Sequence, residues 1–172
     1  MRRRQFIRGG GGSLATALAF APRFAIGGPV GEIAMQGRPD GSKVWFTPYG
    51  LLIRPGQTIR WTNKDNGNSH TATAYASENF DHPRRIPDGT KPFDSGLLLP
   101  DESFEVTFDV PGVYDYFCIP HELSGMVGRI VVAPLDQTLI EDYPDGDLDQ
   151  AILAGFPPIA DILKQGSLEK GE

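Results

Sequence analysis

The segment CIPHELSGM (residues 118–126) contains the only cysteine of the chain, a histidine three residues after it and a methionine five residues after that. A thiolate and two imidazoles, with a long thioether contact along the axis, form a site suited to copper that alternates between its two oxidation states. Cys118, His121 and Met126 supply a thiolate, one imidazole and a thioether. The segment therefore predicts a metal site that needs one further imidazole from elsewhere.

Two other histidines are available for the missing ligand. His70 lies in NKDNGNSHTATAY (63–75), a polar turn that leads into an alternating strand. His82 lies in ENFDHPRRIPDGT (78–90), a charged and proline-rich stretch with no strand pattern. Because a loop at the end of a sandwich can present an imidazole to the Cys118 loop, we expect His70 to be the ligand and His82 to be a solvated loop residue. The exchanged assignment is the alternative.

The segments around these residues alternate apolar and polar side chains as strands do. In VYDYFC (113–118) the alternation puts Cys118 on the same face as Tyr114 and Tyr116, with its sulfur pointing into a sandwich. The 21 glycines and 15 prolines indicate frequent turns and few long helices. We predict an all-β fold, a Greek-key β-sandwich over residues 26–133. Further strand-like runs lie at residues 32–35, 43–47, 51–54, 57–63, 70–75, 103–108 and 126–133.

The N-terminus, MRRRQFIRGGGGSLATALAFA, has the composition of an export signal. Its apolar run, residues 14–21, is far shorter than the roughly 20 residues that span a bilayer. We expect residues 1–25 to be removed, with cleavage after Ala21 or Ala25. RRQFIR (3–8) resembles the twin-arginine export motif, and an ordinary secretory signal with a basic head is the alternative. The mature protein would then be periplasmic or otherwise extracytoplasmic.

Ordinary core packing is the alternative to a metal site, because a buried cysteine and methionine beside a histidine occur in many proteins. Cys118, however, has no partner for an internal disulfide, and an exposed thiol outside the cytoplasm would be oxidised. Cys118, His121 and Met126 also lie together in one short segment, and a further histidine is available elsewhere in the chain. We therefore favour copper binding.

Removal of the export signal makes the chain strongly acidic. Residues 1–25 contain five of the 16 basic residues and no acid, which leaves 11 lysines and arginines against 22 acids and a net charge of −11. This balance argues against nucleic acid and anionic membranes as partners.

The last part of the chain, residues 134–172, is an acidic C-terminal extension with nine acids and two lysines. Its apolar residues recur at helical spacing, which predicts two short amphipathic helices. A loosely ordered acidic tail is the alternative. The apolar positions are Leu148, Ile152 and Phe156, then Ile159, Ile162 and Leu163 after a Pro-Pro pair.

Residues 95–132, SGLLLPDESFEVTFDVPGVYDYFCIPHELSGMVGRIVV, resemble the C-terminal half of plastocyanins and pseudoazurins, which are blue-copper proteins of the cupredoxin family. The similarity lies in the Gly-x-Tyr-x-Tyr-x-Cys strand, the Cys-x-x-His-x-x-x-x-Met loop and the Gly-Met-x-Gly sequence that leads to the last strand. The strand IRWTNKD (59–65), followed by a histidine, is also similar, so the resemblance extends over about residues 30–133.

The resemblance implies a type 1 copper site with His70, Cys118 and His121 as equatorial ligands and Met126 as the axial ligand. The sequence departs from the family at Thr71, where asparagine is common, which puts in doubt how rigidly the surroundings hold the cysteine sulfur.

The resemblance also implies that electrons pass through the ring of His121 while a redox partner docks transiently near it. An apolar rim of Pro120, Leu123 and either Leu51 or Leu97 is expected, and the acidic mature chain indicates a basic face on the partner.

This ligand set predicts an electron carrier rather than an enzyme, because no carboxylate–histidine or serine–histidine arrangement lies beside it. A copper-delivery or storage protein is an alternative, although such proteins favour open methionine-rich clusters and this chain has three methionines. An accessory copper subunit of a redox enzyme complex is a second alternative, and a metal-free binding module is a third. Residues 76–92 are either part of a partner surface or a plain loop.

Overall fold

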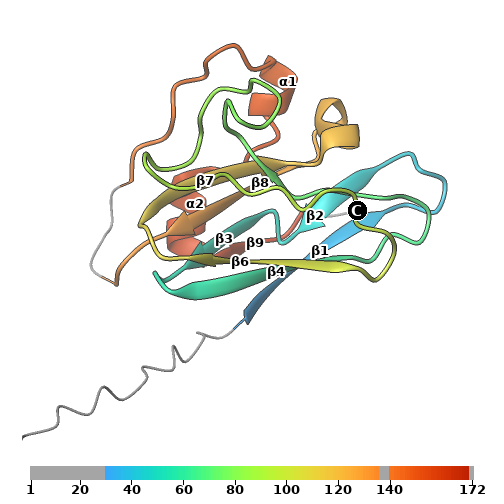
Figure 1. The fold of residues 1–172 in the computed structure, drawn as a ribbon, viewed down its shortest axis with the longest axis horizontal. Helices are drawn as coiled ribbons and strands as arrows, with labels where there is room; N and C mark the ends of the chain where they lie inside the picture. The colour runs from blue at the N-terminus through green and yellow to red at the C-terminus, as the bar shows by residue number, and fades with distance from the viewer. Residues whose placement is uncertain (1–29, 136–139, 171–172) are drawn as a thin grey trace, which may run out of the picture.

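The computed structural model describes residues 30–135 and 140–170, and Figure 1 shows a sandwich of two β-sheets. The expected export signal, residues 1–25, lies outside the described residues. The elements in chain order are β1 (Val30–Gly37), β2 (Val44–Thr47), β3 (Gly50–Ile53), β4 (Gln57–Asn63), β5 (Thr73–Ala74), β6 (Ser103–Phe108), β7 (Gly112–Phe117), the 3₁₀ helix η1 (Ile119–Ser124), β8 (Val127–Val132), α1 (Gln150–Leu153), α2 (Ile159–Gln165) and β9 (Ser167–Leu168).

The strands form a four-stranded sheet in the order β2-β1-β4-β6 and a five-stranded sheet in the order β5-β7-β8-β3-β9. The pairs β1–β4 and β3–β8 are parallel, and the other pairs are antiparallel. Neighbours in each sheet are mostly distant in sequence, so the chain crosses repeatedly between the two layers. This arrangement confirms the predicted all-β sandwich.

The predicted alternation places the core between the sheets. Trp61 of β4 and Tyr116 of β7 are fully buried, and their ring centroids lie 5.4 Å apart in an edge-to-face contact. Cys118, directly after β7, is fully buried in the same cluster. The inward face of β7 therefore delivers the cysteine to one end of the sandwich.

The opposite face of the five-stranded sheet is also buried, because the C-terminal extension covers it (Figure 1). The two predicted short helices are confirmed as α1 and α2, and the extension adds the edge strand β9. Ile152 and Phe156 pack on Phe117 and Val127 in one apolar cluster. Val113 and Val131 pack against Ile159 and Ile162 in a second cluster, so α2 covers this part of the sheet.

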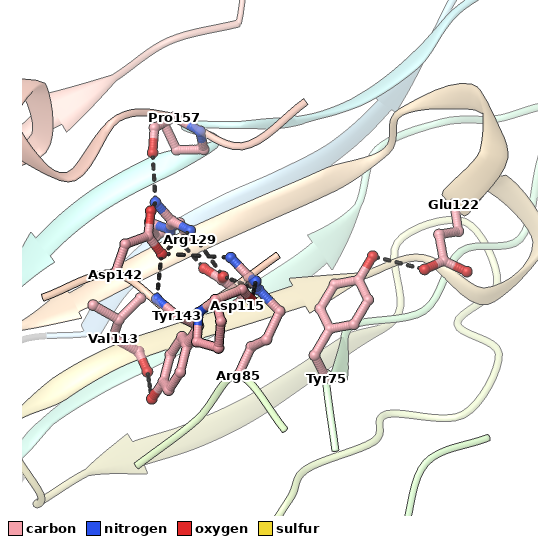
Figure 2. Close-up of polar contacts among 10 residues, drawn as sticks. Tyr75, Arg85, Val113, Asp115, Glu122, Arg129, Asp142, Tyr143 and Pro157 are labelled. Atoms are coloured by element: carbon pink, nitrogen blue, oxygen red, sulfur yellow. Dashed lines mark hydrogen bonds and ion pairs between the residues drawn. The ribbon is translucent and has the colours of Figure 1, made fainter. Parts of the chain in front are cut away.

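A buried network of charges joins the extension to the sheet (Figure 2). The Asp115 carboxylate accepts hydrogen bonds from Nε of Arg85 at 2.8 Å and from Nε of Arg129 at 2.6 Å. Asp142 of the extension accepts from Nη1 and Nη2 of Arg129, both at 2.8 Å. The carbonyl of Pro157 accepts a further bond from Arg129 at 3.2 Å. The extension therefore completes the neutralisation of two buried guanidinium groups.

Residues 76–92 are partly built into the sandwich rather than forming a plain loop. The backbone N–H of Arg85 donates to the carbonyl of Tyr75 at 3.0 Å, and the N–H of Asp115 donates to the carbonyl of Arg85 at 2.9 Å. Ile86 is 1% exposed and belongs to the main core.

No helix in the part of the chain that the structure describes is long and apolar enough to cross a membrane.

Candidate metal centre

Three of the predicted ligands converge at one end of the sandwich. His70, Cys118 and His121 each offer a ligand atom, and these three atoms lie within 4.8 Å of one another. The sulfur of Cys118 is 3.6 Å from Nδ1 of His70 and 3.4 Å from Nδ1 of His121. Both rings thus direct the same nitrogen toward the sulfur, as three ligands of one metal ion require.

The loop between β7 and β8 brings the backbone of Met126, the fourth predicted ligand, beside Cys118 and His121. The N–H of Cys118 donates to the carbonyl of Met126 at 3.1 Å, and the N–H of Met126 donates to the carbonyl of His121 at 3.2 Å. The loop turns at Gly125, whose φ of 73° and ψ of 25° are left-handed values that glycine adopts at little cost. The Met126 side chain is fully buried in the core cluster that contains Cys118.

Thr71 holds the cysteine sulfur and the start of the ligand loop. Its backbone N–H donates to the sulfur of Cys118 at 3.3 Å. Its hydroxyl oxygen accepts from the N–H of Ile119 at 2.9 Å and from the hydroxyl of Thr73, also at 2.9 Å. The threonine hydroxyl therefore links the loop that carries His70 to the start of the loop that carries Cys118 and His121.

Asp65 orients the ring of His70, a contact that the sequence analysis missed. Oδ2 of Asp65 lies 3.1 Å from Nε2 of His70, whose side chain is fully buried. Burial acts to raise the pKa of Asp65, but hydrogen bonds from Asn68 and Gly67 outweigh it and lower that pKa. Because the carboxylate can only accept, Nε2 carries the ring proton and Nδ1 is left free to bind a metal.

The protonation states of the three converging groups follow from burial. Burial lowers the pKa of His70 and of His121, which favours the neutral imidazole that binds metals. Burial raises the pKa of the Cys118 thiol to about 11. The thiol is therefore protonated at neutral pH until a metal displaces its proton.

The chain matches one known protein family over the part that holds this cluster. The family model described as "Copper binding proteins, plastocyanin/azurin family" matches residues 33–133, more than half of the chain. The chain belongs to this family. The cofactor of this cupredoxin is therefore type 1 copper, and its function is that of a blue-copper electron carrier.

Two similar proteins are plastocyanins. The chain is 33% identical over 96 residues to the chloroplastic plastocyanin of Tetradesmus obliquus, a match that covers 54% of this chain and 61% of the relative. It is 33% identical over 105 residues to the plastocyanin of Scenedesmus fuscus, covering 59% of this chain and 99% of that protein.

A solved structure confirms the fold of the cupredoxin. The pseudoazurin of Sinorhizobium meliloti superposes with a TM-score of 0.51 and 23% identity, covering 80% of this chain and 99% of the pseudoazurin.

His82 is not the solvated loop residue that the sequence predicts. Its ring packs edge-on against Phe117, with centroids 4.7 Å apart, and Nε2 lies 3.4 Å from Oε2 of Glu122. Glu122 also accepts a hydrogen bond from the hydroxyl of Tyr75 at 2.7 Å (Figure 2). The expectation failed because Phe117 points outward from β7 and supplies an apolar surface that the loop covers.

Of the residues expected to form an apolar rim around His121, three are exposed and one is not. Pro120 is exposed, Leu123 is 84% exposed and Leu97 is 65% exposed. Leu51 is not on the rim, because it lies in β3 and packs against the core between the sheets. His121 is partly exposed, Leu123 lies on its own 3₁₀ helix, and Leu97 precedes the residue that pairs with His70.

Proposed function

We propose that His70, Cys118 and His121 are the equatorial ligands of the copper ion in this cupredoxin and that Met126 is its axial ligand. The observation that carries the proposal is the convergence of the first three ligand atoms within 4.8 Å. When bound, the copper ion accepts and releases one electron by alternating between Cu(II) and Cu(I).

The surroundings of the ligands limit how far they move when the oxidation state changes. Asp65 fixes the ring of His70, and Thr71 donates to the Cys118 sulfur while its hydroxyl holds the next residue of the loop. A ligand set held in one geometry needs little rearrangement on gaining or losing an electron, so transfer is fast. These contacts are the protein's own contribution to electron transfer.

We propose His121 as the point where electrons enter and leave. Its ring is partly exposed, whereas His70, Cys118 and Met126 are fully buried. Leu123, on the same 3₁₀ helix, supplies apolar surface for a transient contact. Because the mature chain is strongly acidic, a redox partner with a basic face would be steered toward it.

The burial of the ligands favours an electron carrier over a copper-delivery protein, since delivery requires that a partner reach the metal. Within residues 30–135 and 140–170, only this site brings three or more histidine, cysteine or carboxylate side chains close enough together to hold a metal ion. A second metal centre, as an accessory subunit of an enzyme complex would use, therefore has no support in that part of the chain.

We propose further that residues 1–25 are a twin-arginine export signal and that the mature protein works in the periplasm. The RRQFIR motif and the short apolar run behind it, residues 14–21, support this proposal. In this division residues 26–133 form the copper domain and residues 134–172 form the extension that packs on it.

Ligand variants test the assignment. His70→Ala and His121→Ala should each abolish the narrow copper hyperfine splitting of a thiolate-bound Cu(II) in electron paramagnetic resonance. His82→Ala, a matched control, should leave the spectrum unchanged. Loss of the signal in His82→Ala with retention in His70→Ala would overturn the assignment.

A further inference from the structure

The C-terminal strand brings the end of the extension to the ligand loop. In β9, Leu168 pairs with Gly50 and Ser167 pairs with Leu51 of β3. The N–H of Tyr49 also donates to the carbonyl of Leu168 at 3.0 Å. This pairing fixes the backbone just before Lys170, so the position of that lysine is set by the sheet.

Lys170 reaches from this strand to the turn that precedes the proposed axial ligand. Its Nζ donates to the carbonyl oxygen of Gly125 at 2.8 Å, and it lies 5.6 Å from the centre of the Tyr49 ring. The carbonyl belongs to the peptide bond that joins Gly125 to Met126. Burial lowers the pKa of Lys170, which shows that its ammonium group is partly withdrawn from water.

A second part of the extension packs on the same peptide. A Cβ atom on Gly155 would lie 2.9 Å from Cγ2 of Val127 and 3.6 Å from the carbonyl oxygen of Gly125. Ile152 packs in one cluster with Phe117 and Val127, which directly precede Cys118 and follow Met126. The extension thus contacts the ligand loop at both of its ends as well as at its turn.

We propose that Lys170 is a positioning residue of the copper site, which holds the Gly125–Met126 peptide and favours the reduced state of the copper. This inference rests on the proposed role of Met126 as the axial ligand. The family model ends at residue 133, so it does not cover Lys170.

The two effects have separate physical causes. The hydrogen bond restricts rotation of the Gly125–Met126 peptide, which fixes the position of the Met126 Cα atom. Without it, the backbone dihedral angles of Gly125 could change more freely. The positive charge destabilises Cu(II) more than Cu(I), because the oxidised site carries one more positive charge and the groups are partly shielded from water. Removing Lys170 should therefore loosen the loop and lower the reduction potential.

The test compares Lys170→Met with Lys170→Arg, and it uses Lys164→Met as the control. Lys164 is an exposed residue of α2 in the same extension, so its replacement removes the same charge without touching the loop. Hydrogen exchange at the amide of Met126 is measured in the copper-free full-length chain. The midpoint potential is measured in the copper-loaded protein.

In Lys170→Met, exchange at Met126 should be about ten times faster, as expected for losing a hydrogen bond from a charged donor. The ratio of Cu(I) to Cu(II) at a fixed ambient potential should fall, and each tenfold fall corresponds to about 59 mV. Lys170→Arg should restore both values toward those of the unmodified chain, since it keeps the charge and the donor.

Equal exchange rates and potentials in Lys170→Met and Lys164→Met would overturn the inference, as would a failure of Lys170→Arg to restore them. Failure of the proposed ligand set would look different, because the unmodified chain would then lack an intense thiolate-to-copper band in the visible region. The exchange measurement on the copper-free chain would still decide whether Lys170 holds the turn.

Discussion

Replacing Asp115 with asparagine would remove the main counter-charge of two buried guanidinium groups. The Asp115 side chain is fully buried, and those of Arg85 and Arg129 are 3% and 2% exposed. The carboxylate accepts three hydrogen bonds, from Nε of Arg85 at 2.8 Å and from Nε and Nη2 of Arg129 at 2.6 and 2.9 Å. An asparagine side chain carries no charge, and its amide group would face guanidinium donors.

The expected cost follows from how little water reaches the network. Removing one partner of a buried ion pair typically costs about 3 to 5 kcal/mol, because the remaining charge is left without compensation. Asp142 remains as a counter-ion, and its side chain is 49% exposed. We therefore expect Asp115→Asn to lower the free energy of unfolding by about 3 kcal/mol, the lower end of that range.

Urea denaturation of the copper-free protein measures this loss. Asp101→Asn is a suitable control, because Asp101 makes an ion pair with Lys64 at 2.8 Å in which both side chains are more than half exposed. Its φ of 65° is one that asparagine tolerates well. The control should lose no more than about 1 kcal/mol, since exposed pairs contribute little.

If Asp115→Asn lost no more stability than Asp101→Asn, the proposed role of the buried network would be refuted. The same would hold if added salt removed the difference between the two variants, because salt screens mainly exposed charges. Either result would mean that water reaches the guanidinium groups and that the extension does not seal the network.

Three further predictions concern the ligand loop and the core beneath it. Loading the site with Cu(II) at neutral pH should release about one proton per copper, measured in weakly buffered solution, because the buried thiol of Cys118 has a pKa of about 11; Cys118→Ser should release none. Gly128→Ala should lower the free energy of unfolding by about 1 to 3 kcal/mol in urea, because the new Cβ would lie 2.3 Å from the Tyr116 ring; an unchanged midpoint would contradict this packing. Thr71→Ala should cost the copper-free protein about 1 to 3 kcal/mol, because the N–H of Ile119 loses its acceptor; Thr71→Ser should recover most of the loss.

The proposed ligands could be predicted from the sequence because they have local signals. Cys118, His121 and Met126 lie within nine residues, and the alternation of the strand before them fixes the direction of the cysteine. His70 could be chosen because it follows a polar turn at the start of an alternating run. The structure brings it to the Cys118 sulfur as expected.

The sequence could not predict which residues are buried on the outer face of the five-stranded sheet. The alternation of apolar and polar residues along a strand does not show which segment covers that face. Asp115 and Arg129 occupy positions that point away from the core of the sandwich, so they look like surface residues until the extension is seen to lie over them. Phe117 likewise points away from that core, and the loop that carries His82 packs on it. Asp65 was missed because its contact with the histidine is made within a turn, although the run Asp-Asn-Gly-Asn was a signal for that turn.

The central claim is that the cysteine thiolate binds the copper of a one-electron carrier. The most direct test is the visible absorption spectrum of the protein with one equivalent of Cu(II), measured before and after a reductant and compared with Cys118→Ser. We expect an intense thiolate-to-copper band that bleaches on reduction, returns on oxidation and is missing in the variant. A weak copper absorption that is the same in both proteins would contradict it.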